Sequence, residues 1–105
     1  MIELSPKEYE LGEQTWYDAK FYGMMFSLNN TVWKLPSKAD MEEIFRSVDH
    51  DLDECQWYWC ADEFGAATAV AYYNDFKDRA MPYIMNGSKA DQAGVRLIRV
   101  IPEHA

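Results

Sequence analysis

Two cysteines are the first side chains whose type and spacing could support chemistry. Cys55 and Cys60 form a C-x4-C pair, which could bridge a metal ion or supply a reactive thiolate. Asp62 and Glu63 follow Cys60 closely, and neighbouring carboxylates raise the pKa of a thiol, which disfavours the thiolate. We therefore predict that the cysteines are free, buried residues on a strand and that neither is catalytic.

A run of acidic residues that begins at Asp49 has the D-x-D-x-D opening of an EF-hand calcium loop. Its remaining positions do not fit, because Glu54 stands where the loop needs glycine and Cys60 where it needs a bidentate glutamate. His50 and His104 are too far apart in the sequence to suggest a zinc site, and no serine has a G-x-S-x-G context. The sequence therefore predicts no metal, no cofactor and no enzymatic activity.

Acidic side chains are concentrated in the middle of the chain. Residues 40–63 contain nine of the 18 acidic residues, and Arg46 is the one lysine or arginine among them. Such a negative face either keeps a small domain soluble or steers a basic partner onto a recognition surface. The residues that we predict to bind the partner are Glu42, Glu43, Asp49, Asp51, Asp53, Glu54, Trp57, Asp62, Glu63 and Tyr72.

Aromatic residues flank this acidic segment and could anchor a partner. Trp57, Tyr58, Tyr72 and Tyr73 are of the types that carry much of the binding energy at protein interfaces. Alternate residues of a strand point to opposite faces, so about half of the four can be exposed on one side. Ordinary core packing is the alternative role for each of them.

Composition limits the class of protein. The chain has 105 residues and a net charge of −8, which favours one domain and disfavours direct binding to nucleic acid or to an anionic membrane. An apolar fraction of 49% argues against disorder. There is no apolar run of transmembrane length and no signal peptide near the N-terminus, so we expect a cytoplasmic protein with reduced cysteines.

Two helices are expected in the first half of the chain. Residues 15–28 form the first, with Thr15 as N-cap and Asp18 completing a capping box. Its apolar stripe contains Trp16, Ala19, Tyr22 or Gly23, and Phe26. The second follows Ser37 as N-cap, with Asp40 three residues later. Its apolar face contains Met41, Ile44, Phe45 and Val48.

Strands dominate the second half. Aromatic and β-branched residues predict strands at residues 56–61, 66–73, 81–85 and 95–101, the last as one buried central strand. Turn signals lie between them at residues 63–65, 74–75 and 86–88. Two helices followed by antiparallel strands indicate the α+β class.

The order of several motifs resembles a known family. The motifs are T-W-Y-D-A from Thr15, W-K-L-P-S from Trp33, Y-W-C-A from Tyr58, the strand that begins at Ala69, and G-V-R-L-I-R from Gly94. In this order, over residues 8–101, they resemble the C-type-lectin-like domains of bacterial and phage proteins. Those domains are related to the formylglycine-generating and sulfatase-modifying enzymes.

The resemblance implies two helices packed on a twisted antiparallel sheet. It implies core positions for Trp33 and Trp59, and a loop held by charge-assisted hydrogen bonds from Arg96 or Arg99. The C-x4-C spacing is that of the copper-binding pair of formylglycine-generating enzymes, but their serine- and arginine-rich motifs are missing here. The E-P-N or Q-P-D triplet of calcium-dependent lectins is also absent.

In this family the segments between the second helix and the last strands present the binding surface, and here they are acidic and aromatic. We therefore predict a small, non-enzymatic intracellular protein that docks on a basic protein partner. Such a protein would suit a phage-encoded inhibitor, or a nucleic-acid mimic, that acts on a host factor.

The alternative is a lectin-like module that binds a glycan or another small molecule in a concave pocket near Trp57 and Tyr72. A remote third hypothesis, an enzyme, requires Cys55 and Cys60 within metal-bridging distance. The oligomeric state stays open.

Overall fold

Two long neighbouring strands, β5 (Gln56–Glu63) and β6 (Thr68–Asn74), form the centre of the computed structural model. The model describes residues 2–28, 31–46, 50–74 and 83–101. A five-stranded sheet has the order β2-β8-β5-β6-β7, with β2 (Leu11–Gln14), β7 (Tyr83–Ser88) and β8 (Ala93–Val95). All its pairs are antiparallel except β5 and β8, which run parallel.

Two small sheets complete the strand pairing. Strand β1 (Ile2–Leu4) pairs with β9 (Ile98–Val100), which joins the first and last strands of the described chain. Strands β3 (Ser27–Leu28) and β4 (Thr31–Val32) form a two-stranded sheet beyond the first helix. A short 3-10 helix, η1 (Lys7–Tyr9), links β1 to β2.

Both predicted helices are confirmed, with the predicted caps. Helix α1 (Trp16–Met25) begins after Thr15, whose hydroxyl accepts a hydrogen bond from the Asp18 amide. Helix α2 (Lys38–Arg46) begins after Ser37. There the Ser37 hydroxyl accepts from the Asp40 amide at 3.1 Å, while the Asp40 carboxylate accepts from the Ser37 amide at 2.9 Å. This reciprocal pair satisfies amides that a helix start otherwise leaves without partners.

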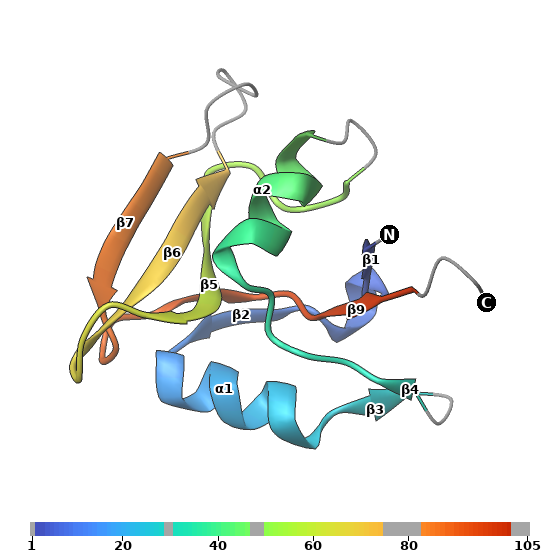
Figure 1. The fold of residues 1–105 in the computed structure, drawn as a ribbon, viewed down its shortest axis with the longest axis horizontal. Coiled ribbons are helices and arrows are strands. Elements are labelled where there is room, and N and C mark those ends of the chain that lie inside the picture. The colour runs from blue at the N-terminus through green and yellow to red at the C-terminus, as the bar shows by residue number, and fades with distance from the viewer. Residues whose placement is uncertain (1, 29–30, 47–49, 75–82, 102–105) are drawn as a thin grey trace.

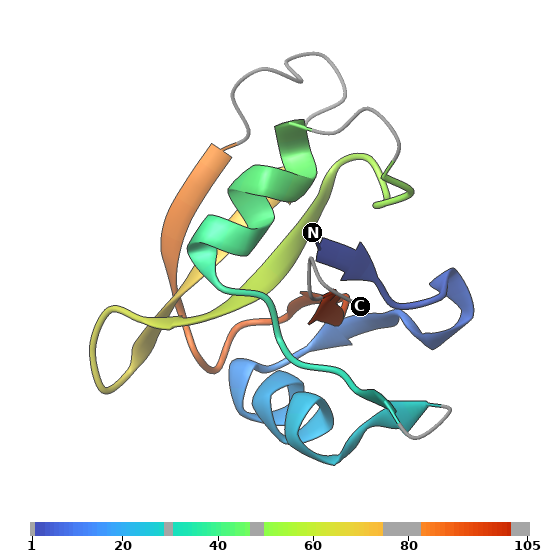
Figure 2. The same cartoon turned by 45° about the vertical axis from the view of Figure 1, so that its right-hand side comes forward.

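The helices pack on different faces of β5 and β6, because successive side chains of a strand point to opposite sides. Odd-numbered residues such as Trp59 and Ala71 join Trp16 of α1 in one core, which also contains Trp33. Even-numbered residues such as Tyr58 and Tyr72 pack with Met41 and Ile44 of α2 in a second core. Figures 1 and 2 show α1 along the lower side of the molecule and α2 in its upper half. The expected α+β class and the core positions of both tryptophans are confirmed.

Several predicted boundaries are wrong. Residues 95–101 are not one central strand: Arg96 and Leu97 separate β8, which pairs with β2 and β5, from β9, which pairs with β1. Residues 86–88 are not a turn, because they pair with β6 as part of β7. The first helix ends at Met25 instead of residue 28, since the next residues pair with β4. Val48, Asp75 and residues 81–82 lie outside the described residues.

We expect loss of the α2 cap to weaken the fold measurably. Replacing Ser37 with alanine removes the acceptor for the Asp40 amide, and the free energy of unfolding should fall by about 1 kcal/mol. Urea unfolding followed by circular dichroism measures the change. Ser27→Ala, at an exposed serine of β3, is the matched control and should change stability by less than about 0.5 kcal/mol. Equal losses in the two variants would contradict a capping role.

Candidate functional site

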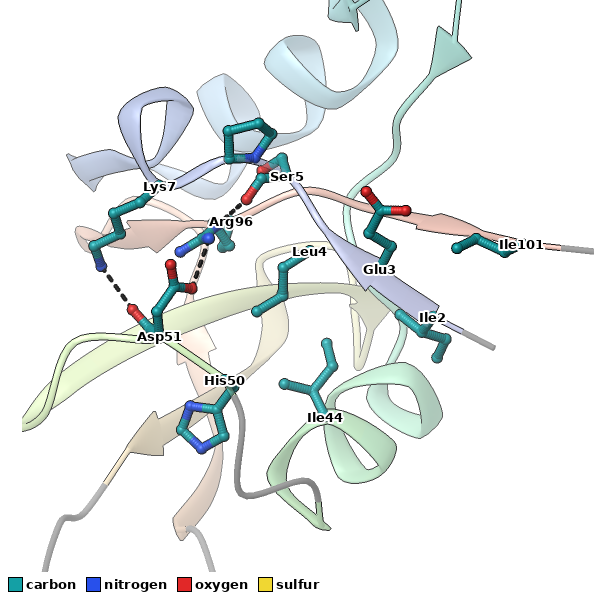
Figure 3. A pocket seen from close by; sticks show the side chains of 11 residues that line it. Ile2, Glu3, Leu4, Ser5, Lys7, Ile44, His50, Asp51, Arg96 and Ile101 are labelled. Carbon is teal, nitrogen blue, oxygen red and sulfur yellow. Dashed lines mark hydrogen bonds and ion pairs between the residues drawn. The ribbon is translucent and has the colours of Figure 1, made fainter.

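A buried arginine occupies the break between β8 and β9. The Arg96 side chain is 3% exposed, and each of its nitrogens donates to a different residue. Its Nε donates to the Ser5 carbonyl at 2.7 Å, Nη1 to the Glu10 carboxylate at 3.1 Å, and Nη2 to the Asp51 carboxylate at 2.7 Å. Figure 3 shows Arg96 between Ser5 and Asp51. The expectation that Arg96 would hold a loop is confirmed.

Glu10 balances this buried charge. Its side chain is 9% exposed and accepts hydrogen bonds from Arg96, from Lys7 at 2.9 Å and from the Tyr58 hydroxyl at 3.1 Å. Burial raises the pKa of Tyr58 well above its usual range, so the hydroxyl stays protonated and can donate to Glu10. Buried charges are tolerated when their hydrogen-bonding groups are satisfied in this way.

The network fixes an irregular segment, residues 50–55, which we call the acidic loop. The side-chain amide nitrogen of Asn74, Nδ2, donates to the backbone carbonyls of Leu52 and Asp53, at 3.1 and 2.9 Å. The Asp53 amide donates to the Tyr58 hydroxyl at 2.7 Å. Cys55 has a φ of 58°, in the left-handed region, and its amide donates to the Asn74 carbonyl. The backbone of the loop is therefore held at several points although it has no regular secondary structure.

The carboxylates of the acidic loop remain accessible to solvent. The side chains of Asp51 and Asp53 are 57% and 58% exposed, and Glu54 is exposed as well. Lys7 donates to the Asp53 carboxylate at 2.8 Å and to the Asp51 carbonyl at 3.0 Å. The hydrogen bond from Lys7 lowers the pKa of Asp53, so this carboxylate stays ionised at neutral pH. The loop thus presents charged groups on a fixed backbone.

The predicted acidic surface is divided between two ends of β5. The acidic loop precedes this strand, whereas Asp62 and Glu63 lie at its other end, six or seven residues and roughly 20 Å from Gln56. There Asp62 accepts from the Lys38 amide at the start of α2, and Glu63 pairs with Lys89. Asp62 and Glu63 are therefore separated from the acidic loop by the length of β5, and each has its own partner at that end of the strand.

The remaining predicted carboxylates are on α2 or outside the described chain. The Glu42 carboxylate accepts from the Tyr72 hydroxyl at 2.8 Å, and Glu43 is exposed. Asp49 lies outside the described residues.

The predicted role of Tyr72 as an exposed anchor is also wrong. Its side chain is 2% exposed and packs in the core beneath α2. Tyr58 is buried in the same core, because both residues are on the even-numbered face. Trp57 and Tyr73 are on the other face, where their rings lie 5.0 Å apart and Trp57 is partly exposed. Of the two aromatic residues predicted to bind the partner, only Trp57 is accessible.

A pocket of about 410 Å³ lies beside Trp57. Trp57, Trp59, Met85 and Gly87 provide apolar surface, and Asp91 and Gln92 provide polar groups. The Trp59 indole nitrogen donates to the Gln14 carbonyl at 2.8 Å, which fixes the ring against Gly87. The pocket therefore combines a partly exposed indole with a carboxylate and an amide.

A second cavity, of about 530 Å³, lies between β1, α2 and the acidic loop. In Figure 3, Leu4 and Ile44 form its apolar part, while Lys7, Asp51 and Arg96 form its polar end. The polar groups at that end already bind one another, so the cavity adjoins the network without adding a free charged group to it.

The two cysteines differ in their surroundings. Cys60 is buried in β5, as predicted, and burial together with the Asp62 carboxylate raises the pKa of its thiol. Cys55 is exposed in the acidic loop, so its predicted burial on a strand is wrong. Within residues 2–28, 31–46, 50–74 and 83–101, no three His, Cys, Asp or Glu side chains are arranged to hold a metal ion.

One surface was missed by the sequence analysis. Tyr17, Phe21, Met24 and Met25 are exposed on the outer side of α1, and we call them the α1 stripe. A signal was present, because residues 16–26 are apolar on nearly every side of a helix and only one side can face the core.

No protein-family model matches the chain, and a search of curated proteins finds no significant relative. Among the described residues, no helix has both the length and the apolar character needed to cross a membrane. The use of the site must therefore be inferred from its geometry.

We expect Arg96 to be the most sensitive charged residue of this network. Arg96→Met leaves the Glu10 carboxylate buried without its main cationic partner and should lower the free energy of unfolding by about 3 kcal/mol. Adding Glu10→Gln removes the buried charge, which then has the more exposed Lys7 as its remaining cationic partner, and should restore part of the loss. Arg99→Met, at an arginine in a more exposed ion pair with Glu3, should cost about 1 kcal/mol or less.

Urea unfolding of the wild type, both arginine variants and the double variant forms the complete test. Equal losses at the two arginines, or no recovery in the double variant, would show that the buried network does not contribute as described.

Proposed function

We propose that this protein is a non-enzymatic binding protein that docks on a basic protein partner through the acidic loop. The observation that carries the proposal is the exposure of Asp51, Asp53 and Glu54 on a backbone fixed by Arg96, Tyr58 and Asn74. Cationic side chains of a partner are the groups that these carboxylates would recognise.

Two physical effects favour this use of the loop. A loop that is already ordered loses little conformational entropy on binding, so more of the contact energy appears as affinity. A net charge of −8 attracts a basic partner over a distance and raises the association rate. Glu43 lies on α2, which ends near the loop, and would add to the same field.

One version of the proposal is a nucleic-acid mimic, in which carboxylates take the place of phosphates in a basic groove. The partner would then be a nucleic-acid-binding protein, and duplex DNA or RNA would compete with this chain for the same binding site on it. A partner that nucleic acid does not displace would leave general docking in place and exclude mimicry.

Neutralising the acidic loop should remove binding. The protein is immobilised on a resin and incubated with a lysate of its native host. Partners that it retains at about 50 mM salt should elute at a salt concentration near about 0.5 M, because screening weakens exposed charge pairs. Asp53→Asn combined with Glu54→Gln should retain much less of the same partner. Mass spectrometry of the eluted fractions measures both effects.

The matched control removes the same charge elsewhere. Glu13→Gln combined with Asp18→Asn changes the net charge from −8 to −6, as the loop variant does, but at exposed residues of β2 and α1. It should retain the partner. Capture that survives high salt, or that both double variants reduce equally, would show that the acidic loop is not the recognition surface.

A second candidate function is binding of a sugar or another small neutral molecule. The observation that favours it is the pocket beside Trp57, whose volume of about 410 Å³ lies within the range of ligand sites. A sugar ring could stack on the indole while Asp91 and Gln92 accept and donate hydrogen bonds. Tyr72 takes no part, because it faces the other core.

This second function predicts stabilisation by sugars. Glucose, galactose, mannose or N-acetylglucosamine at about ten times a millimolar Kd should stabilise the protein by about 1.4 kcal/mol, a rise in Tm of roughly 5 °C. Differential scanning fluorimetry measures it, and salt should change it little. Trp57→Ala should abolish the shift, whereas Phe64→Ala, at an exposed aromatic residue between β5 and β6, should keep it. A shift that persists in Trp57→Ala would place the ligand elsewhere.

A C-type-lectin-like relationship remains part of the proposal. It is supported by the places that the motif residues take: Thr15 and Trp16 begin α1, Trp33 and Pro36 lie buried on the approach to α2, and Tyr58 is in the central strand.

A further inference from the structure

The α1 stripe is an exposed apolar surface along one helix. Tyr17, Phe21, Met24 and Met25 are 55%, 64%, 72% and 68% exposed, and the other three lie three or four residues from Phe21, which places them along one side of the helix. Contiguous exposed apolar side chains of this size commonly mark an interaction surface.

The residues of the α1 stripe are not needed for the core, because α1 already has another side that is buried. The inner side of α1 already packs through Trp16, Ala19 and Gly23, and the Trp16 indole donates to the Cys60 carbonyl at 2.9 Å. In Figures 1 and 2 no other described element covers the outer side of α1, at the end of the molecule away from α2. The helix therefore presents a second apolar side after its first has been buried.

The charges on α1 itself are balanced, one acidic and one basic, unlike those of the whole chain. Asp18 and Lys20 are on the helix, and Lys89, which lies 4.4 Å from the Trp16 ring centre, pairs with Glu63. A basic partner is attracted to the acidic loop, but this neutral end gives it no advantage. A neutral apolar surface instead suits an identical surface. We infer that the α1 stripe binds the α1 stripe of a second copy of this chain.

An antiparallel pair of α1 helices makes the contact self-complementary. With Phe21 at the two-fold axis, Tyr17 of one copy lies opposite Met25 of the other, and sulfur–aromatic contacts are favourable. At about 200 Å² for each large side chain, the exposed parts amount to roughly 500 Å² per copy. The pair would bury about 1,000 Å², the lower limit for a specific interface, so the dimer should be weak and depend on concentration.

Sedimentation equilibrium of the purified protein tests this inference at several concentrations and two salt levels. Two copies of charge −8 repel each other, so raising the salt from about 20 to 300 mM should strengthen dimerisation. Partner binding through the acidic loop should weaken over the same range, so failure of one proposal does not imply failure of the other. A monomer at every concentration and at both salt levels would overturn the inference.

Variants locate the interface. Phe21→Gln or Met24→Gln should weaken dimerisation at least about tenfold, since each removes an exposed anchor without changing the charge. Phe64→Gln is the matched control, because Phe64 is 72% exposed but lies outside α1, and it should dimerise like the wild type. Circular dichroism establishes that each variant is folded, and Met24→Gln serves if Phe21→Gln is not. A dimer that survives the α1 changes, or that Phe64→Gln weakens equally, would overturn the inference.

Discussion

The hydrogen bonds of the buried Arg96 guanidinium are the constraint on which the rest of the arrangement depends. A buried arginine is unfavourable unless nearly every donor finds an acceptor. Here the acceptors come from Ser5 and Glu10 in the N-terminal segment and from Asp51, which is far from both in the sequence. One side chain therefore ties the N-terminal segment, the acidic loop and the junction of two sheets together. A change in any of these segments removes a hydrogen-bond partner of the buried guanidinium.

This constraint would allow the same residues to serve the structure and the proposed recognition surface. Asp51 gives one oxygen to Arg96, yet its side chain is 57% exposed. Asp53 gives one oxygen to Lys7 and is exposed to a similar degree. An internal hydrogen bond thus orients each carboxylate, while the rest of the group remains accessible to solvent. Recognition by such groups needs no rearrangement of the loop, and their internal partners reduce the charge that a basic partner meets without removing it.

Local signals made the helices predictable, and distant pairing made several strands unpredictable. Thr15 and Ser37 cap helices through residues three positions away, so a short window of sequence contains the whole interaction. By contrast, β1 is three residues long and exists because it pairs with β9 at the other end of the chain. Residues 95–101 have the composition of one strand, but the Arg96 contacts turn the chain from one sheet to another.

The same distinction applies to the site. Closeness in sequence suggested that Asp62 belonged with Asp51, but an extended strand separates its two ends instead of joining them. Strand alternation allowed either Trp57 or Tyr72 to be exposed, and only the packing of α2 decided between them. What results is a molecule with fixed carboxylates on the acidic loop and four exposed apolar side chains on α1. On the proposed uses, salt would weaken attraction to the first and reduce the repulsion that opposes contact at the second, so the two surfaces could act independently in one molecule.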